Sequence, residues 1–350
     1  MAAFSDGRDD FDAALIPGMR TRLEEGYRRF RAAERVAMAQ NAPPAAGGLT
    51  GNYFERNCPN CAAPAPGEAA LQAHGLDVIN CPSCRMTYTR QVMDEAADAV
   101  RYQASEIDDE AMNLHSLGAF LELESTRARY YLDRIGGLNP QMGSMLEIGC
   151  GSGTFIVEAG KRGWDTLGIE PSTAAAALAR RRGAKVVEGY FPRDVPADRR
   201  LFQTIAVLDV LEHFAYPRRL LAAVRDYLEP GGRLFIQVPN WDSLLVQLEG
   251  ATSSTVCPGH WSYFTPQTLA DMLAREGYRA VFVETVVSEL DRVAHFSKAE
   301  QLATIKRLRP SAEVTPPAGG SNFMTEVVLT PAQLHGLKLG YKLIGLFERS

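Results

Sequence analysis

Apolar and polar positions along the middle of the chain predict strands and helices in turn. From residue 145 onward, short apolar runs are separated by stretches whose apolar residues recur at helical spacing. The predicted strands are 145–148, 165–170, 185–188, 202–208 and 233–238, and the predicted helices between them are 154–162, 172–182 and 217–227. Parallel strands need a crossover connection, usually a helix. We therefore expect an α/β fold on a doubly wound, Rossmann-like and mostly parallel sheet, with ligands at the carboxyl ends of the strands.

The first helical pattern begins near Pro17 and runs to about residue 40. Its apolar residues recur at helical spacing among Arg and Glu residues: Met19, Leu23, Tyr27 and Phe30. Such a stripe is buried against a partner, and the candidates are the body of the protein and a second copy of the chain. We therefore expect one N-terminal helix and leave monomer and homodimer as alternatives.

Periodicity and composition divide the chain into five segments. These are an N-terminal helix and linker (1–51), a small module with two cysteine pairs (52–92), a helical segment over the ligand site (93–143), the α/β domain (144–287) and a C-terminal insertion or lid with a final element (288–350). Further helices are predicted at 108–136 and 266–276, and a strand at 279–286. Residues 288–324 predict a helix and a long loop, and long loops often act as lids over substrates.

The composition is that of an ordinary globular protein. The 350 residues carry a formal net charge of -5, which argues against broad attraction to nucleic acid. No run approaches the roughly 20 apolar residues that span a bilayer, and the N-terminal residues lack a signal-peptide pattern. We expect a soluble cytoplasmic protein without a membrane partner.

The most specific chemical signal is the run Met145–Phe155, which reads Met-Leu-Glu-Ile-Gly-Cys-Gly-Ser-Gly-Thr-Phe. An apolar strand ends here in Glu147 and in three closely spaced glycines, Gly149, Gly151 and Gly153. Glycines permit positive φ and leave no Cβ between the loop and a ligand. A dinucleotide fingerprint would need its third glycine at position 154. The spacing therefore favours S-adenosylmethionine over NAD.

A second acid supports this interpretation. Gly-Ile-Glu170-Pro-Ser reads as the end of the next strand, where a carboxylate accepts hydrogen bonds from ribose hydroxyls in related folds. A glycine-rich turn that only connects a strand to a helix would not predict Glu170. We therefore expect S-adenosylmethionine as cofactor and S-adenosylhomocysteine as its product.

Two C-x-x-C pairs indicate a metal site. Nineteen residues separate the pairs, and the four cysteines are Cys58, Cys61, Cys81 and Cys84. This spacing is typical of a zinc ribbon, and in a reducing compartment it favours metal over disulfides. A module this small buries little apolar surface, so we expect one structural Zn²⁺ that supplies much of its folding free energy. Glycine often follows the second cysteine of each knuckle, where Ala62 and Arg85 stand here.

These motifs occur together with three others over about residues 117–286. The set of motifs and their order along the chain resemble the class I S-adenosylmethionine-dependent methyltransferases. The others read Asp209-Val-Leu-Glu-His213-Phe, Leu228-Glu-Pro-Gly-Gly-Arg-Leu-Phe-Ile-Gln-Val-Pro-Asn240 and His260-Trp-Ser-Tyr-Phe-Thr-Pro-Gln-Thr-Leu. The order is similar to that of small-molecule methyltransferases of the ubiquinone-pathway and natural-product kind. The resemblance implies a seven-stranded sheet and an enzyme that methylates a small-molecule acceptor.

The resemblance also implies which residues hold the cofactor. We expect Glu147 near the methionine part, Glu170 at the ribose, the Glu188-Gly189 segment beside the adenine and Asp209 by the sulfonium. The full set is Glu147, Gly149, Cys150, Gly151, Gly153, Glu170, Pro171, Glu188, Asp209 and Val210. These motifs describe the cofactor site and the scaffold, and they do not identify the acceptor.

An N-terminal zinc module joined to this fold resembles some deoxysugar C-methyltransferases. Those enzymes carry a run close to Tyr-His-Glu-His-Phe-Ser-Tyr-Phe, and the similar stretch here is Cys257-Pro-Gly-His-Trp-Ser-Tyr-Phe264. His260 and the Ser-Tyr-Phe are kept, whereas Cys257 and Gly259 replace the tyrosine and the glutamate. O-methylation and C-methylation of a sugar-like or secondary-metabolite acceptor therefore both stay open.

Two histidines are candidates for a general base. Methyl transfer to a hydroxyl or an acidic carbon requires proton removal, which suits histidine near neutral pH. His213 follows the fourth strand with Glu212 beside it, and His260 lies among four aromatic residues between positions 241 and 264, where an acceptor pocket would form. The alternatives are that His213 braces the next helix and that the aromatic residues belong to the core.

Two other functions remain open. Zinc-ribbon rRNA methyltransferases exist as a family, so the ribbon could grip RNA through Arg85, Arg90 and Tyr88, although the acidic chain argues against a nucleic-acid partner. The other is a non-catalytic subunit that binds S-adenosylmethionine.

Overall fold

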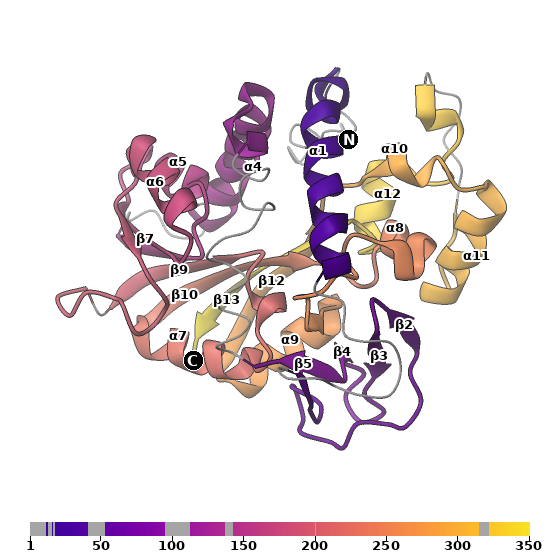
Figure 1. Ribbon diagram of the computed structural model, residues 1–350, viewed down its shortest axis with the longest axis horizontal. Coiled ribbons are helices and arrows are strands. Elements are labelled where there is room, and N and C mark those ends of the chain that lie inside the picture. The colour runs from indigo at the N-terminus through magenta and orange to yellow at the C-terminus, as the bar shows by residue number, and fades with distance from the viewer. Residues whose placement is uncertain are drawn as a thin grey trace.

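The apolar runs from residue 144 onward form one seven-stranded sheet in the order β12-β13-β10-β9-β6-β7-β8 (Figure 1). The computed structural model describes residues 12, 16, 18–40, 53–94, 113–136, 143–199, 201–314 and 322–350. The strands are β6 (Ser144–Ile148), β7 (Asp165–Glu170), β8 (Val186–Glu188), β9 (Phe202–Leu208), β10 (Leu228–Pro239), β12 (Tyr278–Val286) and β13 (Lys342–Arg349). The pairs from β10 to β8 are parallel, which confirms the expected Rossmann-like, mostly parallel sheet.

The last strand, β13, inserts between β10 and β12 and is antiparallel to both. Its register with β10 runs from Arg233↔Glu348 to Pro239↔Lys342. The sequence predicted a final element without its type or its place. The strand brings Lys342 to the carboxyl end of β10, the edge of the sheet where ligands bind in this class of fold.

Residues 230–232, whose Pro-Gly-Gly sequence is typical of a turn, lie inside β10. Leu228 pairs with Phe202 and Arg233 pairs with Thr204, so β10 carries extra residues against β9 between these two pairs. Gly231 lies within this stretch and has a φ of 73°. The turn residues therefore form an irregularity in one strand, and β10 begins at Leu228, earlier than expected.

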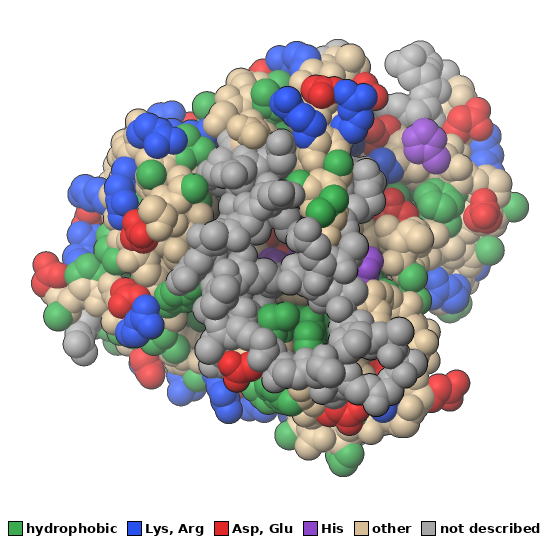
Figure 2. Space-filling view, in the orientation of Figure 1, with side chains coloured by type: hydrophobic (Ala, Val, Ile, Leu, Met, Phe, Trp, Pro, Cys, Tyr) green, Lys and Arg blue, Asp and Glu red, His purple; other side chains and the backbone are tan. Residues whose placement is uncertain are grey.

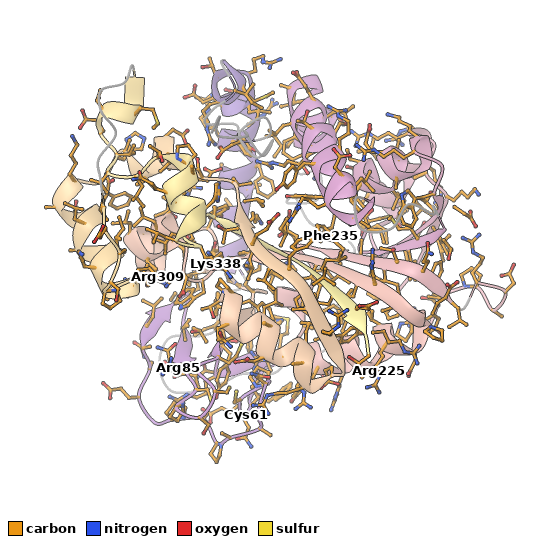
Figure 3. The ribbon with its side chains drawn as sticks, turned by 180° about the vertical axis from the view of Figure 1, so that it is seen from behind. Cys61, Arg85, Arg225, Phe235, Arg309 and Lys338 are labelled. Atoms are coloured by element: carbon orange, nitrogen blue, oxygen red, sulfur yellow. The ribbon has the colours of Figure 1, made fainter. Side chains whose placement is uncertain are left out.

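Helices cover both faces of the sheet. On one face, α4 (Gly118–Gly136) and α5 (Thr154–Lys161) pack against Phe235, and α6 (Thr173–Arg181) lies along the β8 edge (Figures 1 and 3). On the other face, α7 (Pro217–Tyr227) and α9 (Pro266–Arg275) pack against Ile236. Adjacent strand residues point to opposite faces, so both faces of β10 are buried, as a doubly wound sheet requires.

The cysteine module is an antiparallel ribbon that borders α9 (Figure 1). Its strands are β1 (Tyr53–Glu55), β2 (Leu71–Ala73), β3 (Leu76–Asn80), β4 (Thr87–Thr89) and β5 (Gln91–Met93). A short strand of the α/β domain, β11 (Ser262–Tyr263), pairs with β4 and so extends the ribbon's sheet. Ile79, Met86 and Tyr88 share one core cluster with Phe264 and Leu269. The ribbon and the α/β domain therefore share a sheet and part of a core.

The N-terminal helix α1 (Met19–Gln40) packs its apolar stripe on the same chain. Met19 and Leu23 are fully buried against Leu114, Phe120 and Leu123. The apolar stripe of α1 is thus buried against the body of the same chain. The predicted linker after α1 lies outside the described residues.

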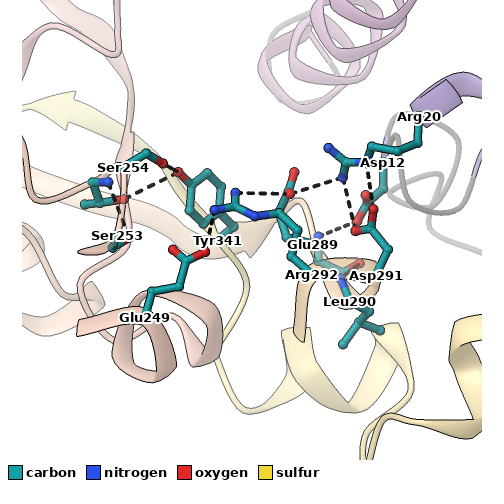
Figure 4. Close-up of polar contacts among 12 residues, drawn as sticks. Asp12, Arg20, Glu249, Ser253, Ser254, Glu289, Leu290, Asp291, Arg292 and Tyr341 are labelled. Carbon is teal, nitrogen blue, oxygen red and sulfur yellow. Dashed lines mark hydrogen bonds and ion pairs between the residues drawn. The ribbon is translucent and has the colours of Figure 1, made fainter. Parts of the chain in front are cut away.

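An ion-pair network joins α1 to the C-terminal part of the chain (Figure 4). Arg20 contacts Glu289 at 3.1 Å and Asp291 at 2.7 Å. Arg292 contacts Glu289 at 3.4 Å and Glu249 at 2.6 Å. Glu289 is buried at the centre of this network. The network ties α1 to α10 (Leu290–Val293) and to α8 (Leu244–Glu249).

The region 288–324 contains more helix than the sequence predicted. Both α10 and α11 (Lys298–Leu308) lie in it, and α12 (Pro331–Gly336) precedes β13. These helices and α8 share one apolar cluster that includes Leu245, Leu290, Ile305 and Leu334. The double-proline and double-glycine part of the predicted loop lies outside the described residues. Among the described helices, none combines the length and apolarity needed to span a membrane.

Candidate functional site

The three glycines after β6 all have positive φ, between 50° and 75°. A Cβ on Gly149 would lie 2.6 Å from Val210 Cγ2, and one on Gly153 would lie 2.7 Å from Ala179 Cβ. A Cβ on Gly151 would have no neighbour within 4 Å. Gly149 and Gly153 thus let the side chains of Val210 and Ala179 pack closely against the loop. Gly151 instead borders open space at the mouth of the loop.

Glu170 at the end of β7 is held by this loop. Its Oε2 accepts a hydrogen bond from Gly151 N at 2.8 Å, and its Oε1 accepts one from Ser172 N at 2.9 Å. The side chain is buried, so the two amides fix the carboxylate beside the glycine loop. Pro171 follows and is half-buried.

A cavity of about 270 Å³ opens next to the loop. The lining residues come from β6 and its loop, from α4 and from the ends of β9, β10 and β13; they include Glu147, Gly149, Cys150, Gly151, Ser152, Glu124, Arg127, Tyr131, Asp209, Gln237 and Lys342. His115 also lines the cavity, and its Nδ1 lies 3.3 Å from Ser152 Oγ. The sequence did not link this histidine to any site. The helical segment before the sheet thus does contribute side chains to the cavity.

Glu147 is the most buried acid of this cavity. Its Oε2 has no hydrogen-bond partner among the described residues. Burial, with Glu170 nearby as a second cause, raises the pKa of Glu147 well above its usual value. A ligand that brings a positive charge or several N–H donors would satisfy this carboxylate.

Glu188 lies farther out than the other predicted cofactor residues. It is exposed, pairs in register with Glu170 across β7 and β8, and accepts a hydrogen bond from Thr173 Oγ1 at 2.6 Å. It is not among the residues that line the cavity, and neither are Gly153, Glu170, Pro171 and Val210. Its proposed place beside an adenine would put the adenine toward the outer rim of the site.

Asp209 is held by a chain of hydrogen bonds across three elements. Gln237 Nε2 donates to Asp209 Oδ2 at 2.8 Å, and Lys342 Nζ donates to Asp209 Oδ1 at 2.8 Å. Tyr131 donates to Gln237 Oε1. Burial alone would lower the pKa of Lys342, but the charge of Asp209 outweighs it and the pKa lies above the usual value. The lysine therefore stays cationic and anchors the carboxylate.

A second cluster lies directly after Asp209 and joins Glu212 and His213 to His260. One donor atom of each lies within 4.8 Å of the others, and the two imidazole centroids are 4.6 Å apart. His213 Nδ1 lies 2.9 Å from Gly259 O, and His260 Nδ1 lies 2.8 Å from Thr255 O. A carbonyl only accepts, so each neutral ring carries its proton on Nδ1 and its lone pair on Nε2.

Glu212 is almost completely buried in this cluster. It is 1% exposed, and neither carboxylate oxygen has a hydrogen-bond partner among the described residues. Burial, and next the charge of Asp209, raise the pKa of Glu212 to about 8, while Lys342 opposes the shift. A buried carboxylate between two imidazoles can either orient a histidine or complete a set of cation ligands.

The four cysteines come together in the ribbon, where Figure 3 labels Cys61. All four sulfur atoms lie within 4.8 Å of one another, with Cys58 Sγ and Cys84 Sγ 3.5 Å apart and Cys61 Sγ and Cys81 Sγ 3.5 Å apart. Thiolates at a Zn–S distance of about 2.3 Å would be separated by about 3.8 Å. The four residues therefore fit one tetrahedral ion.

The two knuckles share one backbone conformation. Ala62 N donates to Cys58 O and Arg85 N donates to Cys81 O, both at 2.9 Å. Ala62 and Arg85 have φ values of 62° and 63°, the left-handed region that glycine adopts without cost. Each side chain costs about 1 kcal/mol in this conformation. The protein accepts this strain at both places where a glycine was expected.

Sequence reasoning did not identify His115, Tyr131, Gln237 or Lys342 as site residues. Gln237 offered a signal, because it is a polar residue inside the apolar run that forms β10. Tyr131 belongs to an apolar helical stripe, which predicts core packing and gives no sign of its hydroxyl. Lys342 and His115 depend on contacts between elements far apart in the sequence.

A family model described as a methyltransferase domain matches residues 120–283. The match begins in α4 and ends in β12. It therefore includes the glycine loop, Asp209 and the Glu212, His213 and His260 cluster, and it leaves out the ribbon strands β1 to β5.

Two curated relatives illustrate the similarity in sequence. An uncharacterized 37.1 kDa protein in a transposon of Streptomyces fradiae is 29% identical over 179 residues, which are 47% of this chain and 50% of that protein. A ubiquinone biosynthesis O-methyltransferase of Acinetobacter baumannii is 25% identical over 126 residues, which are 34% of this chain and 52% of that enzyme. The chain thus spans about half the length of these relatives.

Two solved structures illustrate the comparison with known structures. A methyltransferase of Thermotoga maritima, described as a possible histamine N-methyltransferase, has a TM-score of 0.43 at 18% identity and covers 69% of this chain and 95% of its own. A geranyl diphosphate C-methyltransferase of Streptomyces coelicolor has a TM-score of 0.42 at 16% identity and covers 73% of this chain and 86% of its own.

Proposed function

We propose that the protein transfers a methyl group from S-adenosylmethionine to a small-molecule acceptor, because residues 120–283 match a family model described as a methyltransferase domain. One observation carries the proposal. The cavity with the glycine loop and Glu147 reaches Asp209, and the cluster of buried Glu212 with half-buried His213 and His260 begins three residues farther along the chain, at the same edge of the sheet. This arrangement supports a cofactor site with a proton-accepting site next to it. We propose O- or C-methylation of a sugar-like or secondary-metabolite acceptor.

The residues of the cavity fit this cofactor. Glu147 Oε2, which lacks a partner among the described residues, would accept from the ammonium of the methionine part. Glu170 would accept from the ribose hydroxyls, and the open space at Gly151 leaves room for the ligand backbone. Asp209 would face the sulfonium. When bound, the cofactor supplies an electrophilic methyl group.

The histidine pair would remove the acceptor's proton. Both rings present Nε2 lone pairs because their Nδ1 atoms donate to carbonyl oxygens. For a hydroxyl acceptor, one Nε2 takes the O–H proton as the oxygen gains the methyl group, and the imidazolium then releases the proton to water. Gly259 O, which accepts from Nδ1, would orient the ring of His213, and the nearby carboxylate of Glu212 would stabilise the positive charge of the imidazolium. Positioning supplies the rest, since methyl transfer is an in-line displacement.

We further propose that the ribbon holds a structural Zn²⁺ through Cys58, Cys61, Cys81 and Cys84. A role in gripping RNA has less support. Tyr88 is fully buried and cannot stack on a base, and Arg90 lies 3.6 Å from Asp77 within the ribbon. On the face in Figure 2, basic and acidic side chains of the described residues are interspersed.

The Glu212, His213 and His260 cluster supports a second candidate role, which is to bind a divalent cation near the acceptor. Three donors within 4.8 Å, one of them a buried carboxylate without a partner among the described residues, match a two-histidine, one-carboxylate ligand set. The assay described next is therefore run with and without added Mg²⁺ or Mn²⁺. Turnover that needs an added cation favours this role, and turnover that does not change favours the general base.

The test of function is to incubate the purified protein with methyl-labelled S-adenosylmethionine and a fractionated lysate. We expect label in the small-molecule fraction with wild type and with His295→Gln, whose exposed histidine makes it a matched control. His260→Gln is expected to lose most of the label. Label in RNA would contradict the proposed acceptor class. Cofactor binding without any label would indicate the non-catalytic subunit.

A further inference from the structure

We propose that Arg56 is a positioning residue that fixes His213 and His260 relative to each other, so that the ribbon is part of the acceptor site. The inference rests on the proposed function, because that function gives the two histidines their role. Arg56 directly follows β1, two residues before Cys58, and is 5% exposed. Its side chain reaches from the ribbon into the α/β domain.

The guanidinium group of Arg56 donates to three backbone carbonyl oxygens. Nε donates to Thr89 O at 3.1 Å, inside the ribbon. The two terminal nitrogens donate to Ala215 O and to Trp261 O, both in the α/β domain. Ala215 follows His213 by two residues, and Trp261 directly follows His260. One ribbon side chain thus joins the two segments that carry the histidines.

Trp261 completes this connection on its other side. Its backbone N–H donates to Glu212 O at 2.8 Å, while its carbonyl oxygen also accepts from Thr89 N at 3.1 Å. The indole is 1% exposed and meets Tyr53 of the ribbon edge-on, with ring centroids 6.4 Å apart. The backbone next to His260 is therefore held by Glu212 on one side and by the ribbon on the other.

The ribbon also holds the rest of the segment around His260. Ser262 and Tyr263 pair with β4. His74 Nε2 lies 3.0 Å from Val256 O, and Val256 follows Thr255, whose carbonyl oxygen receives the Nδ1 proton of His260. Residues on both sides of His260 are therefore placed by ribbon contacts, and one of them, Val256, directly follows the residue that sets the tautomer of His260.

The choice of an arginine at this buried place supports a geometric role. Among the described residues Arg56 forms no ion pair, and burial lowers the pKa of its guanidinium group to about 9. Apolar residues would fill the same interface without the cost of burying a charge. A planar guanidinium, unlike an ammonium, holds several acceptors at fixed angles. Burying this guanidinium group costs free energy, and in return the group fixes the relative positions of three carbonyl oxygens.

The experiment compares Arg56→Lys with Arg90→Lys in protein labelled with ¹³C at the histidine rings. Arg90 contacts Gly67 O and Asp77 within the ribbon, so it is a matched control. The protein has six histidines, and the signals of His213 and His260 are assigned by replacing each with Gln. We expect Arg56→Lys to shift both signals and to leave that of His295, the zinc content and the affinity for S-adenosylhomocysteine unchanged. Arg90→Lys should shift none of them.

In the labelled-lysate assay, Arg56→Lys is expected to reduce label transfer by about tenfold or more, since small displacements of catalytic groups have effects of this size. Unchanged ring signals of His213 and His260 in a folded Arg56→Lys protein would overturn the proposal. The ring signals do not depend on turnover. A wild-type protein that transfers no label would therefore contradict the proposed function and still leave the role of Arg56 measurable.

If Arg56→Lys does not fold, His74→Ala provides a second test. This substitution removes only the contact of the ribbon with Val256 O, at a half-exposed position. We expect it to shift the ring signal of His260 and to leave that of His213 in place. Unchanged signals for both rings would contradict positioning by the ribbon.

Discussion

Lys342 Nζ lies 2.8 Å from Asp209 Oδ1, and this hydrogen bond connects β13 to the end of β9 across 133 residues of sequence. Replacing Lys342 by Met removes the cation from this carboxylate. We expect the free energy of unfolding to fall by about 1 kcal/mol, a modest loss because the Asp209 side chain is 41% exposed. Urea denaturation measures the change, with Lys298→Met as the exposed control. Equal effects of both substitutions would contradict an anchoring role.

Glu170→Gln is expected to weaken cofactor binding. The carboxylate accepts from Gly151 N and Ser172 N, whereas an amide has one acceptor oxygen and no charge for the ribose hydroxyls. The loss of a charge-assisted hydrogen bond corresponds to a rise of about tenfold in the Kd of S-adenosylhomocysteine. Calorimetric titration measures it, and the exposed Glu313→Gln is the control. An unaltered Kd in Glu170→Gln would remove the assignment of the ribose to this residue.

Cys58→Ser is expected to abolish stoichiometric zinc binding, since the four sulfur atoms surround one site. Because Cys58 and Tyr88 share a core cluster with Phe264 of the α/β domain, loss of the metal should destabilise both parts together. We expect the thermal midpoint to fall by roughly 5 °C or more. Elemental analysis and calorimetry report the two effects. Cys257→Ser, which changes a cysteine outside the four-cysteine group, is the control and should keep its zinc. Full zinc content in Cys58→Ser would refute the ribbon site.

Glu289 is expected to make stability depend on pH in the acid range. Burial alone would raise its pKa, but the guanidinium groups of Arg20 and Arg292 hold the pKa of Glu289 below its usual value of 4.5. A depressed pKa means that the stabilisation is present above the unfolded value and is lost as the pH falls through the folded one. Glu289→Gln should therefore lower the free energy of unfolding by about 2 kcal/mol at pH 7 and by less near pH 4.

Urea midpoints of wild type and Glu289→Gln at the two pH values check this prediction. Glu300→Gln serves as a control, because the pKa of Glu300 is lowered at an exposed helix start by Ser297, outside the network of Figure 4. A difference between wild type and Glu289→Gln that stays constant from pH 7 to pH 4 would contradict the prediction.

Local sequence was sufficient for the parts of the site that lie within one strand-loop-helix unit. The glycine loop and Glu170 follow from a strand, its turn and the next strand, and the structure brings Gly151 and Glu170 together. The two cysteine knuckles are also local, since each consists of two cysteines and the residue after them. Their left-handed residues, Ala62 and Arg85, were predictable positions of strain.

The remaining contacts depend on packing between distant segments. The type and place of β13 could not be predicted, because an antiparallel last strand and a helix are equally compatible with its short apolar run. Without β13, the position of Lys342 is undefined. Arg56 lies beside the cysteines and reads as a solvated charge of the ribbon. In the folded protein β11 pairs with β4, and Arg56 contacts Ala215 and Trp261 of the α/β domain.

The place of β13 also determines the order in which the sheet can be assembled. Within the described sheet, β12 is hydrogen-bonded only to β13, although β12 precedes it by about fifty residues in the chain. The parallel strands from β10 to β8 can therefore pair early. By contrast, β12 has no partner strand until β13 has joined the sheet. During refolding, a transient species with an open β10 edge is expected, and such an edge is prone to pair with another chain.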